Sequence, residues 1–204
     1  MNQVQAPVSN KNLIINPKTK DILSYESHVW TSADVLRSSV GLKNSEFPDF
    51  MMPFFALVLI ESRLVRKYVE VLEDKSLITE KDRIDEIKET AGFYNSVIVE
   101  EKILLSDLVK NDKTFDVEFI RYLNAFDLDL KNLLGIIKGD KTENLNLIGC
   151  VDSLKKKRAL FGYVAAWANI DFTPYNNSEI TTLEEHIKRK WADMSAETAG
   201  EQYT

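Results

Sequence analysis

The chain has 204 residues, of which 44% are hydrophobic and 28% charged, but only 7 are glycine and 5 proline. Its length suits one domain with a sizeable core, and so few turn-forming residues argue against a β-sandwich or a barrel. The net charge of −6 at pH 7 argues against strong DNA binding by the chain alone, because binding phosphates calls for a basic excess. One cysteine excludes an intrachain disulfide, and the longest apolar run, residues 51–60, is shorter than the ~20 residues of a membrane span. We therefore expect a cytoplasmic protein that does not enter a membrane.

The first third of the chain predicts a tail followed by two helices. Residues 1–20 are polar and aperiodic, so we expect a partly disordered tail. Apolar residues at helical spacing predict a helix at 24–39, which Gly41 is placed to cap. The longest predicted helix spans 49–74, with Pro53 in its first turns, where a missing N–H costs little.

The polar side of this longest helix carries Arg63, Arg66 and Lys67. Basic residues are ordinary on the solvent-facing side of a helix. A partner subunit could also bind them, so both interpretations stay open.

The region from 97 to 109 is ambiguous, because its apolar residues are dense. A strand at 97–99 and a helix at 100–110 both fit, and the spacing of Ile103 and Leu108 favours the helix. A charged loop is expected at 138–146. Further helices are predicted at residues 79–90, 115–123, 128–137 and 152–169, and from Ser178 or Thr182 to Ala192.

These elements predict an all-α protein, an irregular bundle of about seven or eight helices with little or no β structure. We expect the bundle to form around the helix at 49–74. The chain then divides into a polar tail at 1–20, a helical N-terminal domain at 21–195, and the start of a linker at 196–204.

Metal and nucleophile chemistry is poorly supported. His28 and His186 lack a His or Cys partner three or four residues away, so no metal site is predicted. Cys150 follows Gly149 without a nearby base, which favours a buried structural thiol over a nucleophile.

The densest basic run is Lys155, Lys156, Lys157 and Arg158, called the basic run below. These four side chains are candidates for contacts with DNA phosphates. The alternative is the solvated flank of a helix whose other side is apolar.

Base stacking would need an exposed aromatic residue beside basic groups. Trp191, next to Lys190, is the candidate that the sequence offers. The alternative is a core position, which we expect for Trp30 and Trp167 as well.

Six segments of the chain occur in an order that resembles one known family. The segments are 28–37 (HVWTSADVLR), 46–47 with 52–57 (EF, MPFFAL), 93–95 (FYN), 122–126 (YLNAF), 171–174 (DFTP) and 199–204 (AGEQYT). Together they resemble the N-terminal helical domain of the modification (methylation, M) subunit of type I restriction-modification enzymes, which are adenine-N6 DNA methyltransferases. The family's arginine pair is only partly kept, as Ser62-Arg63-Leu64, and Ser38 and Ala125 stand where the family has glycine.

The resemblance implies that the parent enzyme transfers a methyl group from S-adenosylmethionine to N6 of adenine. It would act with a specificity subunit, a second modification subunit and, for cleavage, a restriction subunit. The helical domain would help to close this complex around double-stranded DNA. In the full-length enzyme, Tyr203 and Thr204 would begin the loop that lines the cofactor pocket.

The chemistry itself would lie outside this stretch. No Gly-x-Gly occurs, and Asn16-Pro17 is followed by lysine rather than by proline and an aromatic residue. The methyl-donor loop and the motif that holds a flipped base in amino-methyltransferases are therefore missing, so we expect no catalytic residue and an inactive fragment. Two alternatives are a free-standing acidic helical interaction protein or decoy, and an unrelated nucleic-acid module built on the basic run.

Overall fold

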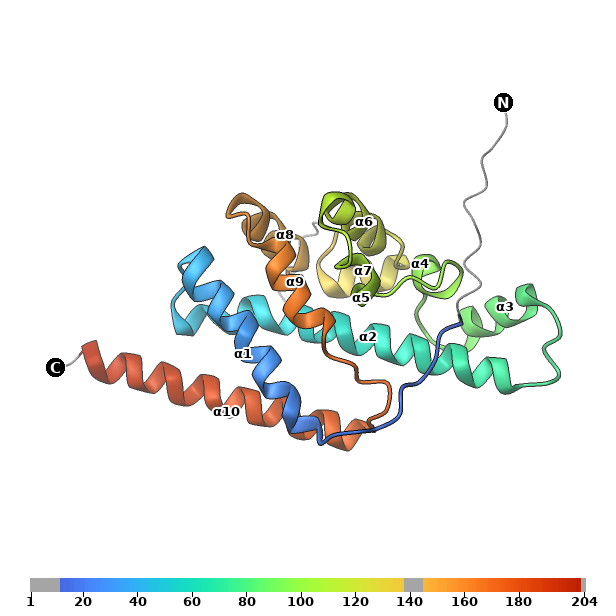
Figure 1. Cartoon of the computed structure of the whole chain (residues 1–204), viewed down its shortest axis with the longest axis horizontal. Helices are drawn as coiled ribbons and strands as arrows, with labels where there is room; N and C mark the ends of the chain where they lie inside the picture. The colour runs from blue at the N-terminus through green and yellow to red at the C-terminus, as the bar shows by residue number, and fades with distance from the viewer. Residues whose placement is uncertain (1–11, 138–144, 203–204) are drawn as a thin grey trace, which may run out of the picture.

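The computed structural model describes residues 12–137 and 145–202. Over these ranges the chain is 71% helix and 1% strand, and its ten helices, eight of them with seven or more residues, pack as a bundle (Figure 1). The predicted all-α fold is confirmed. The helices are α1 (Glu26–Val35), α2 (Phe47–Glu73), α3 (Glu80–Thr90), α4 (Ser96–Val99), α5 (Leu105–Leu108), α6 (Asp112–Asn124), α7 (Leu128–Leu134), α8 (Leu147–Lys156), α9 (Leu160–Ala168) and α10 (Asn177–Gln202).

The bundle is organised around α2, as predicted. In Figure 1, α2 runs across the molecule below the shorter helices α4 to α9, and it contacts α1, α3, α4, α7, α8 and α9. Its inner side is fully buried at Phe54, Leu57 and Leu64, which follow helical spacing. The long helix α10 lies along the lower edge of Figure 1 and packs on two 3-10 turns, Ile22–Tyr25 and Asn44–Glu46.

Pro53 lies deeper in α2 than the sequence predicts, because the helix begins at Phe47 and already has Pro48 in its first turn. A proline inside a helix leaves the carbonyl four residues earlier without its usual donor. Here that carbonyl belongs to Asp49, and the Cys150 thiol donates to it at 3.4 Å. The single cysteine is therefore buried and structural, as predicted, and desolvation raises the pKa of its thiol to about 12.

The region from 97 to 110 differs from the prediction. The helix that we expected at 100–110 is limited to α5, and 97–99 belongs to α4 instead of a strand. The chain breaks at Lys102, whose backbone is left-handed with φ of 61° and whose Nζ lies 4.3 Å from the centroid of the Tyr68 ring. Burial of this one lysine against α2 and α3 overrides the local helical spacing.

The predicted helix at 152–169 is two helices. α8 ends at Lys156 and α9 begins at Leu160. Between them Arg158 takes a left-handed backbone conformation, with φ of 55°, and its N–H donates to the Lys155 carbonyl at 2.9 Å. The turn lets α8 and α9 fold back on each other, so that each buries its apolar side.

The last helix is longer than predicted. α10 begins at Asn177, close to the expected start, and continues past Ala192 to Gln202. The stretch from 196 to 202 is thus helical, and its assignment as the start of a linker stays a prediction.

Two other predictions fall partly outside the described residues, namely 1–11 of the tail and 138–144 of the charged loop. Residues 12–18 of the tail form no helix. No described helix combines the length and the hydropathy that are needed to cross a lipid bilayer.

Candidate functional site

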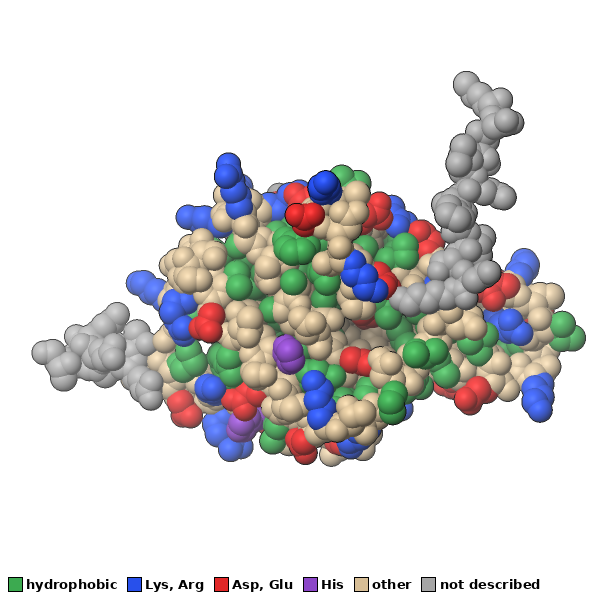
Figure 2. Space-filling model, in the orientation of Figure 1, with side chains coloured by type: hydrophobic (Ala, Val, Ile, Leu, Met, Phe, Trp, Pro, Cys, Tyr) green, Lys and Arg blue, Asp and Glu red, His purple; other side chains and the backbone are tan. Residues whose placement is uncertain are grey.

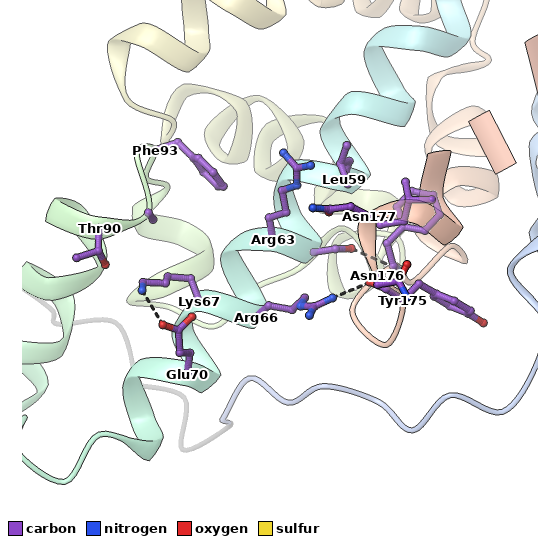
Figure 3. Close-up of a pocket in the computed structure, with 14 residues that line it drawn as sticks. Leu59, Arg63, Arg66, Lys67, Glu70, Thr90, Phe93, Tyr175, Asn176 and Asn177 are labelled. Atoms are coloured by element: carbon purple, nitrogen blue, oxygen red, sulfur yellow. Dashed lines mark hydrogen bonds and ion pairs between the residues drawn. The ribbon is translucent and has the colours of Figure 1, made fainter. Parts of the chain in front are cut away.

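A groove of about 490 Å³ lies between α2, the end of α3 and the start of α10. Figure 3 shows the 14 residues that line it. Three of them are cationic and one, Glu70, is a carboxylate. In a chain with a net charge of −6, this local excess of positive charge sets the groove apart. We call it the α2 groove.

The cationic residues are Arg63, Arg66 and Lys67 of α2. Their spacing of three and four residues places them on one side of the helix. The opposite side of the same helix is fixed in the core by Leu64 and Tyr68. Because the inner side is fixed, the three cations have a defined direction, toward the groove.

Each cation has different surroundings. Arg66 donates from Nη1 to the Tyr175 carbonyl at 2.6 Å, and Lys67 pairs with Glu70 at 2.9 Å (Figure 3). Among the described residues, no carboxylate pairs with the Arg63 guanidinium, which is exposed. Arg66 therefore fastens α2 to the segment before α10, and Arg63 is available to an incoming group.

The wall opposite α10 is formed by Phe93, which is half-buried. Its neighbours hold it in place. Gly92 has φ of 73°, a conformation that favours glycine, and the Tyr94 N–H donates to the Asp127 carboxylate at 2.5 Å. Figure 3 shows Arg63 reaching into the space between Phe93 and Asn177.

The start of α10 supplies amide groups to the groove. Asn176 and Asn177 both line it. The Asn176 side-chain oxygen accepts from the Glu179 N–H at 3.0 Å, and the Glu179 carboxylate accepts from the Asn176 N–H at 3.1 Å. This reciprocal cap fixes the first turn of α10.

Two consecutive polar side chains of α2, Glu61 and Ser62, tie the helix to neighbouring segments. The Glu61 carboxylate accepts from the Tyr122 hydroxyl at 2.6 Å and from the Leu105 N–H at 2.8 Å. The Ser62 hydroxyl accepts from the Phe172 N–H at 3.2 Å. Desolvation of Glu61 raises the pKa of its carboxyl to about 7, against hydrogen bonds that lower it.

The structure places the basic run at the end of α8 and in the turn before α9. All four side chains are exposed, and Lys155 lies 3.4 Å from the carboxylate of Asp116 on α6. On the face in Figure 2, Lys and Arg side chains are interspersed with Asp and Glu. None of the four side chains of the basic run lines the α2 groove.

Trp191 is a core residue, 7% exposed, so the stacking role considered for it is wrong. Lys190 instead covers the ring of Trp30, 4.4 Å from its centroid. His186 Nδ1 lies 3.0 Å from the Glu26 carboxylate. In the described part of the chain, no three His, Cys, Asp or Glu side chains are arranged to hold a metal ion.

The proposed cofactor residues Tyr203 and Thr204 lie outside the described residues. The sequence pointed to Arg63, Arg66 and Lys67, but it did not connect them with Phe93 or Asn177. No spacing rule links positions so far apart in the chain. In comparisons with known proteins, no family model, no curated protein and no solved structure matches this chain.

Proposed function

We propose that this chain is the N-terminal domain of the modification subunit of a type I restriction-modification enzyme. In this role it assembles with a specificity subunit and a second modification subunit, and with a restriction subunit for cleavage. The assembly closes around double-stranded DNA while a catalytic domain methylates adenine N6 with S-adenosylmethionine. The domain itself supplies contacts and carries no catalytic residue.

The observation that carries the proposal is that segments with the family pattern meet in space. Asn95, from the segment FYN, donates from its side chain to the Tyr122 carbonyl at 3.0 Å and forms a bridge with Phe126. Tyr122 and Phe126 belong to the segment YLNAF, which is separate in the chain. Phe172, from DFTP, donates its N–H to Ser62, where the family has its arginine pair.

The first and last parts of the pattern are also joined. Trp30, in the opening segment, donates from Nε1 to Glu26 at 2.9 Å, and the same carboxylate oxygen accepts from Lys190 of α10 at 3.1 Å. α10 is the helix that contains the first four residues of the terminal segment AGEQYT. A pattern whose parts contact one another supports a shared fold more strongly than separate matches in sequence do.

The acidic balance is compatible with a subunit of a larger complex. Phosphate neutralisation can come from the specificity subunit, so this domain does not need a basic excess of its own. An acidic decoy remains the second candidate, because the net charge of −6 suits a protein that competes for basic subunits.

The proposal is tested on the polypeptide that the reading frame encodes beyond Thr204. We expect this longer polypeptide to bind S-adenosylmethionine in isothermal titration calorimetry, and to methylate adenine once its specificity subunit is added. Residues 1–204 alone should do neither. A frame that stops after Thr204, or an extended polypeptide that binds no S-adenosylmethionine, would contradict the proposal and favour the decoy.

A further inference from the structure

We propose that the α2 groove binds an unpaired stretch of DNA, with a phosphate on Arg63 and a base against Phe93. The choice of DNA over RNA rests on the proposed function. The binding chemistry comes from the groove itself, which combines cations, an aromatic ring and side-chain amides.

The phosphate contact follows from the charges in the groove. Arg63 is exposed and has no carboxylate partner among the described residues, whereas Lys67 is neutralised by Glu70. A guanidinium presents several N–H donors that match the oxygens of a phosphate. Arg66 keeps one of its nitrogens on the Tyr175 carbonyl, which leaves its other donors for the same strand.

The base contact follows from Phe93. Unpaired bases bind proteins largely by stacking on aromatic rings beside a basic groove. Phe93 is the aromatic residue that meets this description, since it is half-buried and lines the same groove as the three cations. The ring packs against the hydrophobic core, and the Tyr94–Asp127 hydrogen bond ties down the backbone next to it, which favours a defined position for the ring.

The size of the groove favours an unpaired strand over a duplex. Its volume of about 490 Å³ is in the range of sites that enclose a small ligand, roughly 300–1,000 Å³. A nucleotide fits such a space, but a base pair with both backbones does not. Asn177 and Thr90 at the edges add an amide and a hydroxyl that can form hydrogen bonds with a base.

The experiment is a fluorescence anisotropy titration of residues 1–204 with a labelled single-stranded 12-mer at low salt. We expect Arg63→Glu to weaken binding by about tenfold or more, since it removes one phosphate contact and adds repulsion. Lys156→Glu reverses one exposed charge of the basic run and is the matched control. It should change the affinity by less than about twofold.

The base contact has its own measurement. Phe93→Leu keeps an apolar side chain against the core but removes the aromatic ring. With 2-aminopurine in the strand, we expect the wild-type protein to change the fluorescence on binding and Phe93→Leu to lose most of that change. Circular dichroism melts of every variant separate loss of binding from loss of folding.

Three results would overturn the inference. They are a wild-type protein that does not bind the strand, an Arg63→Glu variant that is folded and binds normally, and a Lys156→Glu variant with the larger loss. Equal competition by a duplex or by a free nucleotide would likewise reject an unpaired strand as the ligand. Because S-adenosylmethionine binding by the extended polypeptide is measured separately, failure here leaves the proposed function standing.

Discussion

Two groups of basic residues in this chain, the basic run and the three cations of α2, differ in how closely they follow each other in sequence and in what surrounds them in the structure. The basic run places four cations in succession, yet all four are exposed at a helix end, and Lys155 turns toward a neighbouring carboxylate. The three cations of α2 are not consecutive in sequence, yet they line one groove with Phe93 and Asn177. Helical spacing and a fixed inner side bring the second group together.

The two groups differ in how firmly the helix or turn that carries them is bonded to the rest of the molecule. α2 is tied to neighbouring segments by hydrogen bonds of Glu61 and Ser62, while the basic run ends α8 and forms a turn that depends on the backbone of Arg158. A binding group on a rigid element loses less freedom when a ligand arrives. The comparison therefore predicts that substitutions of the residues that anchor α2 lower the free energy of unfolding, and that substitutions in the basic run do not.

The largest effect is expected for Tyr122→Phe. The substitution removes the hydroxyl that donates to the Glu61 carboxylate at 2.6 Å and leaves that group short of one partner. We expect a loss of about 2 kcal/mol in the free energy of unfolding. Urea denaturation measures this free energy. A loss no larger than that of a surface substitution would show that the Tyr122–Glu61 hydrogen bond does not support α2.

The second effect is a pH dependence that Glu61 causes. Its pKa is raised from 4.5 to about 7 in the folded chain, so the folded state holds a proton that the unfolded state has released between these values. The contribution of this bound proton to the free energy of unfolding is fully present below pH 4.5 and is lost as the pH rises to 7. We expect the advantage of the wild-type protein over Glu61→Gln to fall by about 1–2 kcal/mol between pH 5 and pH 7. Thermal melts of both proteins across this range test the sign, and an advantage that grows with pH would contradict it.

A smaller effect is expected for Arg66→Ala, at about 1 kcal/mol. The Tyr175 carbonyl loses its charged donor at 2.6 Å, so the segment before α10 loses a hydrogen bond to α2. Lys155→Ala is the matched control, because its ion pair with Asp116 is long and both side chains are well exposed. It should stay within about 0.5 kcal/mol of the wild-type protein. Equal losses of unfolding free energy in Arg66→Ala and Lys155→Ala would show that the α2 cations are no more firmly anchored than the basic run.

The smallest effect concerns Arg158→Gly. A left-handed backbone costs an L residue about 1 kcal/mol, and glycine avoids that cost but loses more entropy on folding. With φ of 55° at Arg158, we expect a net gain of about 0.5 kcal/mol and unchanged strand binding. A clear loss of strand binding would assign the basic run the role that we give to the α2 groove.

The sequence predicted the elements whose pattern is long and regular. The helices predicted at 49–74 and 79–90 match α2 and α3 to within a few residues. Where a predicted helix is interrupted in the structure, the conformation of a single residue causes the break. Lys102 and Arg158 adopt left-handed backbones, and neither is a residue type that marks a turn.

The site could be predicted only in part. Arg63, Arg66 and Lys67 were visible as a polar side of one helix, because helical spacing is a local rule. Their meeting with Phe93 depends on how α3 and α4 fold back along α2, and no local pattern encodes that approach. At Trp191 the sequence left a stacking role and a core position open, and the structure shows the core position.

The central claim is that the α2 groove, and not the basic run, contacts nucleic acid. Photo-cross-linking tests it most directly, with a single strand that carries 5-iodouracil and with mass spectrometry of the digested adduct. We expect the cross-link on the peptide that contains Phe93, and its loss in Phe93→Leu. A cross-link confined to the peptide that contains Lys155 to Arg158 would contradict the account.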